Sequence, residues 1–183
     1  MFVVRPLILI GLLVVTSVPV ALAAERSELS LRTSAPSGLA PVRFAPAAGW
    51  HAVRGTVHAC PGVPASRCSQ VTSAASTTRW RDCVDCLPHK TVAAMRRNGI
   101  AIQVTVAIEH PIRGRRTFAW PPQIRRAGVS AGFEGLPGRI GVYQGATLVG
   151  QREVSLIVFF GQARPTIRQV GRANTQLLHS RLG

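Results

Sequence analysis

Acidic residues and lysine are scarce in this 183-residue chain. It contains 7 Asp and Glu against 22 Lys and Arg, which gives a formal net charge of +15 at pH 7. Lys90 is the only lysine, so almost all of the positive charge is arginine. A charge this high attracts polyanions, such as nucleic acid, acidic envelope polymers or anionic lipid headgroups, without selecting among them. The alternative interpretation is that the charge only keeps the protein soluble.

Motifs that identify a particular chemistry are also missing. The sequence has no glycine-rich phosphate loop, EF-hand loop or dinucleotide-binding fingerprint. No nucleophile elbow frames any serine. The aromatic residues do not alternate with the arginine clusters as a nucleic-acid stacking platform requires, so there is no specific nucleic-acid signal. We therefore expect no cofactor and no metal, and the sequence does not indicate an oligomeric state.

The first residues have the pattern of a secretory signal peptide. Arg5 precedes an apolar run over residues 7–15, and Ala21-Leu22-Ala23 then places small residues where a signal peptidase reads them. We predict a signal peptide over residues 1–23 and an exported protein. The alternative is an uncleaved segment that tethers the protein to a membrane, but polar residues and a proline at 16–19 interrupt the apolar run.

The remaining chain is long enough for one domain. Residues 24–49 are rich in Ser, Pro, Ala and Gly and lack periodicity, which is typical of a flexible linker. Residues 50–183 then form a single disulfide-stabilised domain, since this length supports one hydrophobic core but not two.

Several stretches of this domain alternate with a period of two, as strands do. The clearest is Ile100–Ile108, and residues 50–59 and 71–80 show the pattern less strongly. Residues 139–149 and 152–160 read as a hairpin, because Gly150-Gln151 suits a two-residue turn. The small, partly polar second face of Ile100–Ile108 favours an antiparallel sheet with one face open to water.

Two helices complete the predicted fold. A short one is expected over residues 88–98, with Val92 and Met95 facing inward. An amphipathic one is expected over residues 166–181, where Thr166 and Gln169 have the spacing of a capping box. Its inward positions are predicted to be Ile167, Val170, Asn174, Leu177 and Leu178. The fold class is therefore α+β: an antiparallel sheet of about five or six strands with both helices on one face.

The four cysteines, Cys60, Cys68, Cys83 and Cys86, lie within 27 residues. In an exported chain they are expected to form two disulfides, for which three pairings are possible. An extended segment over residues 71–80 would hold Cys68 and Cys83 too far apart to bond, which favours the pairs Cys60–Cys68 and Cys83–Cys86. If that segment is a folded loop, the crossed pairings remain open.

Other chemistries are possible for the same segment. Cys83-x-x-Cys86 ahead of a helix could serve a thiol-disulfide oxidoreductase, although Asp82 and Asp85 oppose thiolate formation and the βαβ context is missing. Four cysteines could bind zinc, but the spacing between Cys60 and Cys68 is wide for a half-site. Residues such as His58, Ser66 and Ser69 could form a hydrolytic site only if the fold brought them together.

The arginines form three clusters in the middle of the chain. The candidates for binding a polyanion are Arg96, Arg97, Arg113, Arg115, Arg116, Arg125 and Arg126. If the fold gathers them they make one basic patch, and otherwise they are solvated loop ends. We expect a secreted, non-catalytic, arginine-rich binding or structural domain whose partner is an acidic polymer or envelope component. The alternative is a thiol-disulfide oxidoreductase that uses Cys83 and Cys86.

Overall fold

A computed structural model describes residues 39–64, 66–109, 120–133, 135–150 and 152–183, and all of them belong to one compact unit. The helices are α1 (His89–Ala93) and α2 (Ile167–Leu178), with a 3-10 turn at Arg126–Gly128. The strands are β1 (Val42–Phe44), β2 (His51–Arg54), β3 (His58–Ala59), β4 (Cys68–Ser76), β5 (Ile100–Glu109), β6 (Ser130–Ala131), β7 (Gly141–Val149), β8 (Arg152–Phe160) and β9 (Ser180–Leu182).

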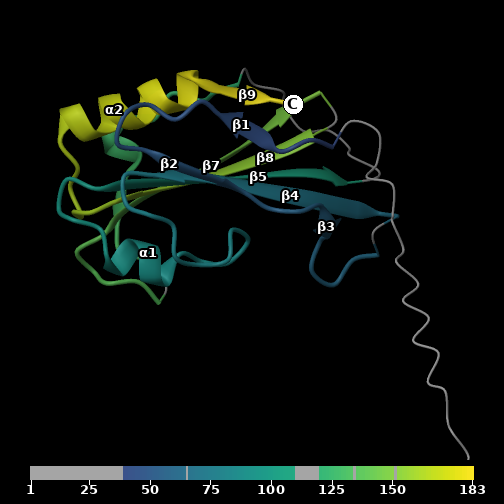
Figure 1. The fold of residues 1–183 in the computed structure, drawn as a ribbon, viewed down its shortest axis with the longest axis horizontal. Helices are drawn as coiled ribbons and strands as arrows, with labels where there is room; N and C mark the ends of the chain where they lie inside the picture. Colours follow the sequence, from purple (N-terminus) through teal and green to yellow (C-terminus); the bar gives the residue numbers. More distant parts are fainter. Residues whose placement is uncertain (1–38, 65, 110–119, 134, 151) are drawn as a thin grey trace, which may run out of the picture. The chain divides into compact units, whose positions relative to one another are not determined.

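An antiparallel sheet is the centre of the fold, as predicted (Figure 1). Its strand order is β2-β4-β5-β8-β7-β6, and β3 also pairs with β4. The described residues thus give this sheet seven strands, against the five or six expected. The predicted strand over residues 50–59 is divided into β2 and β3, and both pair with β4. The domain is of the α+β class.

The hairpin of β7 and β8 has the predicted two-residue connection. Val149 is paired with Arg152, and Gly150 has a φ of 62°. Glycine adopts this left-handed conformation without the steric cost that a Cβ brings. β8 is buried along most of its length and pairs with β5 on its other side, so it lies in the interior of the sheet.

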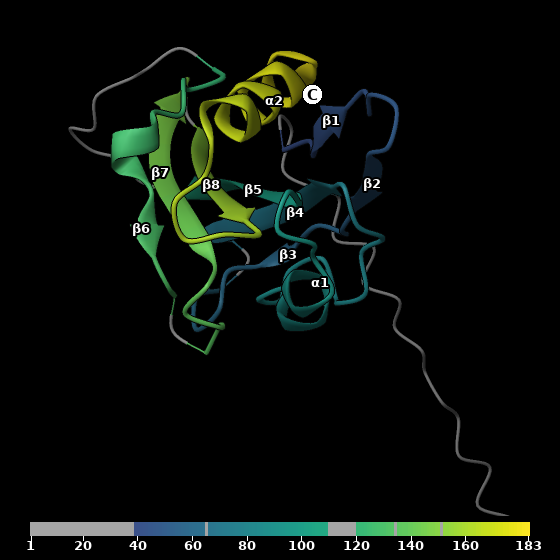
Figure 2. The ribbon, with the colours of Figure 1, turned by 90° about the vertical axis from the view of Figure 1, so that its left-hand side faces the viewer.

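The helices contact opposite faces of the sheet, where the sequence predicted one face for both (Figure 2). Ile102 and Val104 of β5 belong to the cluster that α2 covers, whereas Ala101 packs with Val92 and Met95 on the α1 side. The second face of β5 was expected to meet water. Its first half, Ala101 and Gln103, is buried instead, because the small side chain of Ala101 leaves room for α1 and Gln103 binds the segment before it, while Thr105 and Ala107 are half-buried.

The predicted linker over residues 24–49 differs from the structure at its end. Residues 24–38 lie outside the described residues, but Val42–Phe44 form strand β1, and the side chains of Val42 and Phe44 are buried. β1 pairs antiparallel with β9, at the C-terminus of the chain. This small ribbon lies beside α2, and it explains why α2 ends at Leu178 rather than continuing to Arg181.

Helix α2 begins at the predicted capping box. The Thr166 side chain accepts a hydrogen bond from the Gln169 backbone, and the Gln169 side chain accepts one from the Thr166 backbone. Val170, Ala173 and Leu177 are buried against the sheet. Ile167 and Leu178 were predicted to face inward, but they are 77% and 70% exposed. The direction of the buried face therefore differs from the predicted one at both ends of the helix.

Candidate functional site

A strongly basic hollow lies between the N-terminal half of α2 and the turn that precedes β5. This cleft has a volume of about 670 Å³. Two arginines come from the turn and two from successive turns of α2. They are Arg96, Arg97, Arg168 and Arg172, and we call this group the arginine cleft. Asn98, Gln162, Thr166 and Gln169 complete its lining.

A glycine at the end of β8 allows the turn to approach the sheet. A Cβ atom on Gly161 would overlap the backbone oxygen of Arg96, and the Gly161 N–H donates to the carbonyl of Gly99 at 3.0 Å. No other residue type fits so close to a neighbouring backbone. Gly161 thus holds Arg96 and Arg97 next to the segment that leads into α2.

Gln169, the second residue of the α2 capping box, fixes the same turn from the other side. Gln169 is buried, and its Nε2 donates to the carbonyl oxygen of Arg97 at 3.1 Å. The Nε of Arg97 donates to Oε1 of Gln162 at 2.8 Å. The buried Gln169 thus belongs to the capping box of the helix and also positions the turn that carries Arg96 and Arg97. The shape of the cleft is therefore fixed by contacts within the fold.

Among the described residues, no ion pair joins a guanidinium group of the cleft to a carboxylate. All four arginines are exposed. A concave site lined by one sign of charge focuses the electrostatic field and attracts ions of opposite sign. Guanidinium also has five donors in a planar arrangement that matches sulfate, phosphate and carboxylate oxygens. The cleft can therefore bind an anion with several charged groups.

Two further hollows extend the positive surface. One, of about 430 Å³, shares Arg96, Asn98 and Arg172 with the arginine cleft. The other, of about 500 Å³, is lined by Arg126 and Arg164 and shares Thr166 with the cleft. The basic surface thus continues on both sides of the cleft around the start of α2.

The fold brings together only some of the predicted polyanion-binding residues. Arg96 and Arg97 line the cleft, Arg126 lines the adjoining hollow, and Arg125 is exposed just before it. Arg113, Arg115 and Arg116 lie outside the described residues. Sequence reasoning missed Arg168 and Arg172. Their spacing of four residues did place them on one side of the helix, but which turn faces them depends on long-range packing.

The cysteines are paired locally, as the sequence favoured. Cys60 is bonded to Cys68 and Cys83 to Cys86, with Cα–Cα distances of 5.4 and 5.2 Å. The first bridge closes the loop between β3 and β4. The second is exposed in the segment before α1. Because each cysteine is bonded to another, the four do not converge as the ligands of a zinc site would.

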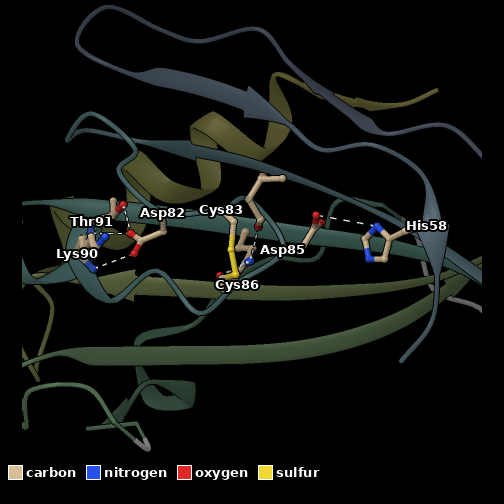
Figure 3. The surroundings of a disulfide bond; sticks show 9 residues. His58, Asp82, Cys83, Asp85, Cys86, Lys90 and Thr91 are labelled. Atoms are coloured by element: carbon tan, nitrogen blue, oxygen red, sulfur yellow. Dashed lines mark hydrogen bonds and ion pairs between the residues drawn. A yellow bond between two sulfur atoms is a disulfide. The ribbon is translucent and has the colours of Figure 1, made fainter. Parts of the chain in front are cut away.

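We call residues 80–88, which hold the second bridge, the cysteine loop, and Figure 3 shows its surroundings. Gln103 of β5 anchors it: Nε2 donates to the carbonyl oxygens of Val84 and Cys86 at 2.7 and 3.1 Å. Gln103 is buried, so these bonds form away from bulk water. The loop is therefore fastened to the middle of the sheet.

Asp82 binds the start of α1. Its carboxylate accepts hydrogen bonds from the backbone N–H of Lys90 at 3.1 Å, and from the N–H and Oγ1 of Thr91 at 2.8 and 2.6 Å. Burial raises the pKa of Asp82, but the bonds from Thr91 and Lys90 and the Lys90 charge outweigh it, so the pKa lies below its ordinary value.

The same bonds bear on the oxidoreductase alternative. A reactive thiol in a C-x-x-C motif is activated when a helix N-terminus or a cation stabilises its thiolate. Here the free N–H groups at the start of α1 bind the Asp82 carboxylate rather than a sulfur atom. Asp85 lies 4.0 Å from the His58 ring and adds a second negative charge nearby. This arrangement favours a structural bridge between Cys83 and Cys86.

The predicted hydrolytic residues do not form a triad among the hydrogen bonds of the described residues. His58 contacts Gln70, the carbonyl of Thr56 and, at 4.0 Å, Asp85. None of these contacts is with Ser66. No helix in the described part of the chain is both long and apolar enough to cross a membrane.

The chain has no significant match among protein-family models, curated proteins or solved structures. The function proposed below is therefore based on the geometry of the described residues.

Proposed function

We propose that this protein is an exported, non-catalytic domain that uses the arginine cleft to bind an acidic polymer or another anionic component of the cell envelope or extracellular space. The observation that carries the proposal is the convergence of Arg96 and Arg97 with Arg168 and Arg172 around one cleft without a nearby described carboxylate. An arginine cluster that served only solubility would not need a shaped site fixed by Gly161 and Gln169.

Export is supported by two separate features. The first 23 residues have the pattern of a signal peptide, and we propose that cleavage after Ala23 releases the protein. Two disulfides also suit an oxidising compartment, since cytosolic thiols are kept reduced. Acidic polymers in that compartment carry sulfate, phosphate or carboxylate groups, which are the groups that guanidinium binds in pairs of hydrogen bonds.

The test measures binding to heparin, a soluble acidic polymer, with a charge-reversed cleft. The double variant Arg168→Glu with Arg172→Glu should bind at least about tenfold more weakly than the wild type in low salt, because it removes two contacts and adds repulsion. The matched control is Arg54→Glu with Arg67→Glu, which changes the net charge equally at two exposed arginines that do not line the cleft.

If heparin binds at the cleft, the cleft variant should lose affinity and the control should not. The control should keep most of the wild-type affinity, and both should unfold at the wild-type temperature because all four arginines are exposed. Equal losses in the two variants would show that the total charge, not the cleft, attracts the polymer. A wild-type protein that does not bind heparin at low salt would overturn the proposal.

A further inference from the structure

Large exposed apolar side chains are few in the described residues, and two of the four lie on α2. Ile167 and Leu178 are 77% and 70% exposed, whereas Val57 and Val63 are only 37% and 39% exposed. Single apolar side chains on a surface are ordinary and need no explanation. What distinguishes Ile167 and Leu178 is their arrangement on the helix.

The two side chains lie on one line along the outer side of α2. They are eleven residues apart, which is three helical turns to within about 20°. Gly171 lies between them and has no side chain that would project beyond theirs. Figures 1 and 2 show α2 lying over one face of the sheet, with β1 beside it. A flat surface could thus contact Ile167 and Leu178 together.

Arginines flank this line on both sides, at the arginine cleft and at the adjoining hollow. Arg168 is exposed about a quarter of a turn away on the helix, and Arg172 is exposed about a third of a turn away. On the other flank, Asn174 holds the backbone of Ile124 through two hydrogen bonds, of 2.9 and 3.0 Å, and Arg125 and Arg126 follow directly. No acidic residue lies within α2.

We propose that the anionic partner of the arginine cleft is the surface of a lipid bilayer with anionic headgroups, on which α2 lies flat. This inference rests on the proposed function, because it uses the same arginines, and it names their partner. A soluble polymer would leave Ile167 and Leu178 in water. A bilayer would bury both side chains at the boundary of the acyl chains while its headgroups bind the arginines, as interfacial helices do.

The position of α2 supports this orientation. Its inward residues, Val170, Ala173 and Leu177, are already buried against the sheet, so the helix would not need to leave the domain to bind. Two apolar side chains alone provide weak anchoring, and stable binding takes a second signal such as a basic surface. Both signals are present around α2.

The experiment compares vesicles with a soluble polymer for one set of variants. The exported protein is mixed with phosphatidylglycerol vesicles, with phosphatidylcholine vesicles and with heparin, and every variant has the same N-terminus, so any contribution from residues 1–23 is common to all. Ile167→Ser with Leu178→Ser should bind the anionic vesicles about tenfold more weakly than the wild type. Its heparin affinity should be unchanged.

Two further variants separate the contribution of the arginines from that of the apolar side chains. Arg168→Ala with Arg172→Ala should weaken binding to both heparin and anionic vesicles, whereas the control Val57→Ser with Val63→Ser should weaken neither. Wild-type binding to vesicles that is unaffected by the change at Ile167 and Leu178 would overturn the bilayer inference. Heparin binding without binding to anionic vesicles would overturn it too and leave the polymer proposal standing. A protein that binds neither would overturn both.

Discussion

The cysteine loop and the arginine cleft are both polar, but their charged groups have different partners. In the loop, the Asp82 carboxylate is bound by Thr91 and Lys90, and Gln103 binds two loop carbonyls. In the cleft, four guanidinium groups face solvent without a described carboxylate. A carboxylate that accepts bonds from the fold's own donors helps to hold the fold, whereas guanidinium groups without an acidic partner can bind an anion from outside.

The comparison predicts two separate classes of variant. Changes in the cysteine loop should lower stability and leave polyanion binding intact. Changes in the arginine cleft should do the reverse.

Removing the disulfides should have the largest effect on stability. In the chain-entropy model the Cys60–Cys68 bridge contributes about 2.5 kcal/mol and the shorter Cys83–Cys86 bridge about 2 kcal/mol. The double variant Cys60→Ser with Cys68→Ser should therefore melt at a lower temperature than Cys83→Ser with Cys86→Ser, and both below the wild type. Thermal unfolding by circular dichroism measures the order.

The same variants test the oxidoreductase alternative. We expect the wild type to catalyse insulin reduction no better than a free dithiol does. We also expect the Cys83→Ser, Cys86→Ser protein to bind heparin with wild-type affinity. Catalysis by the wild type that is lost in this variant would make the cysteine loop an active site and end the contrast with the cleft.

Replacing Asp82 should lower the free energy of unfolding more than replacing the nearby Asp85. Replacing Asp82 with Ala leaves the Thr91 hydroxyl and two backbone N–H groups without their acceptor, and charge-assisted hydrogen bonds of this kind contribute about 1.5–3 kcal/mol. The control Asp85→Ala removes an exposed carboxylate that lies 4.0 Å from His58, which should cost less than about 1 kcal/mol. Urea denaturation gives both values, and equal losses would contradict the role assigned to Asp82.

The lowered pKa of Asp82 makes a smaller, pH-dependent prediction. A carboxylate whose folded pKa lies below the ordinary value of 3.8 adds stability above that pH, and the contribution is lost as the pH falls through the folded pKa. The stability difference between the wild type and Asp82→Asn should therefore be full at about pH 6 and shrink below about pH 4. A difference that grows on acidification would mean that the pKa is raised.

Local patterns predicted much of the sheet and the start of α2. The alternation over Ile100–Ile108 and the Gly150-Gln151 turn depend on neighbouring residues, and so does the capping box of Thr166 and Gln169. β1 was missed because three residues are too few for a periodic signal, and their partner is β9 at the far end of the chain. Pairing at that separation leaves no trace in a single sequence.

The candidate site was predictable only in part for the same reason. Arg96 and Arg97 were recognised as a cluster, whereas Arg168 and Arg172 were not among the predicted binding residues. Their convergence depends on Gly161 and on the bond from Gln169 to the Arg97 carbonyl, both of which are long-range contacts. The exposure of Ile167 and Leu178 was likewise set by how α2 packs, not by its own periodicity.

The salt dependence of heparin binding shows whether the arginine cleft contacts the polymer. Each guanidinium that contacts the polymer releases counterions, so a plot of log K against log salt concentration has a slope that grows with the number of contacts. We expect a steep negative slope for the wild type, and a slope shallower by about two in Arg168→Ala with Arg172→Ala. We also expect the wild-type slope in Arg54→Ala with Arg67→Ala. An unchanged slope in the cleft variant would show that the arginine cleft does not bind the polymer.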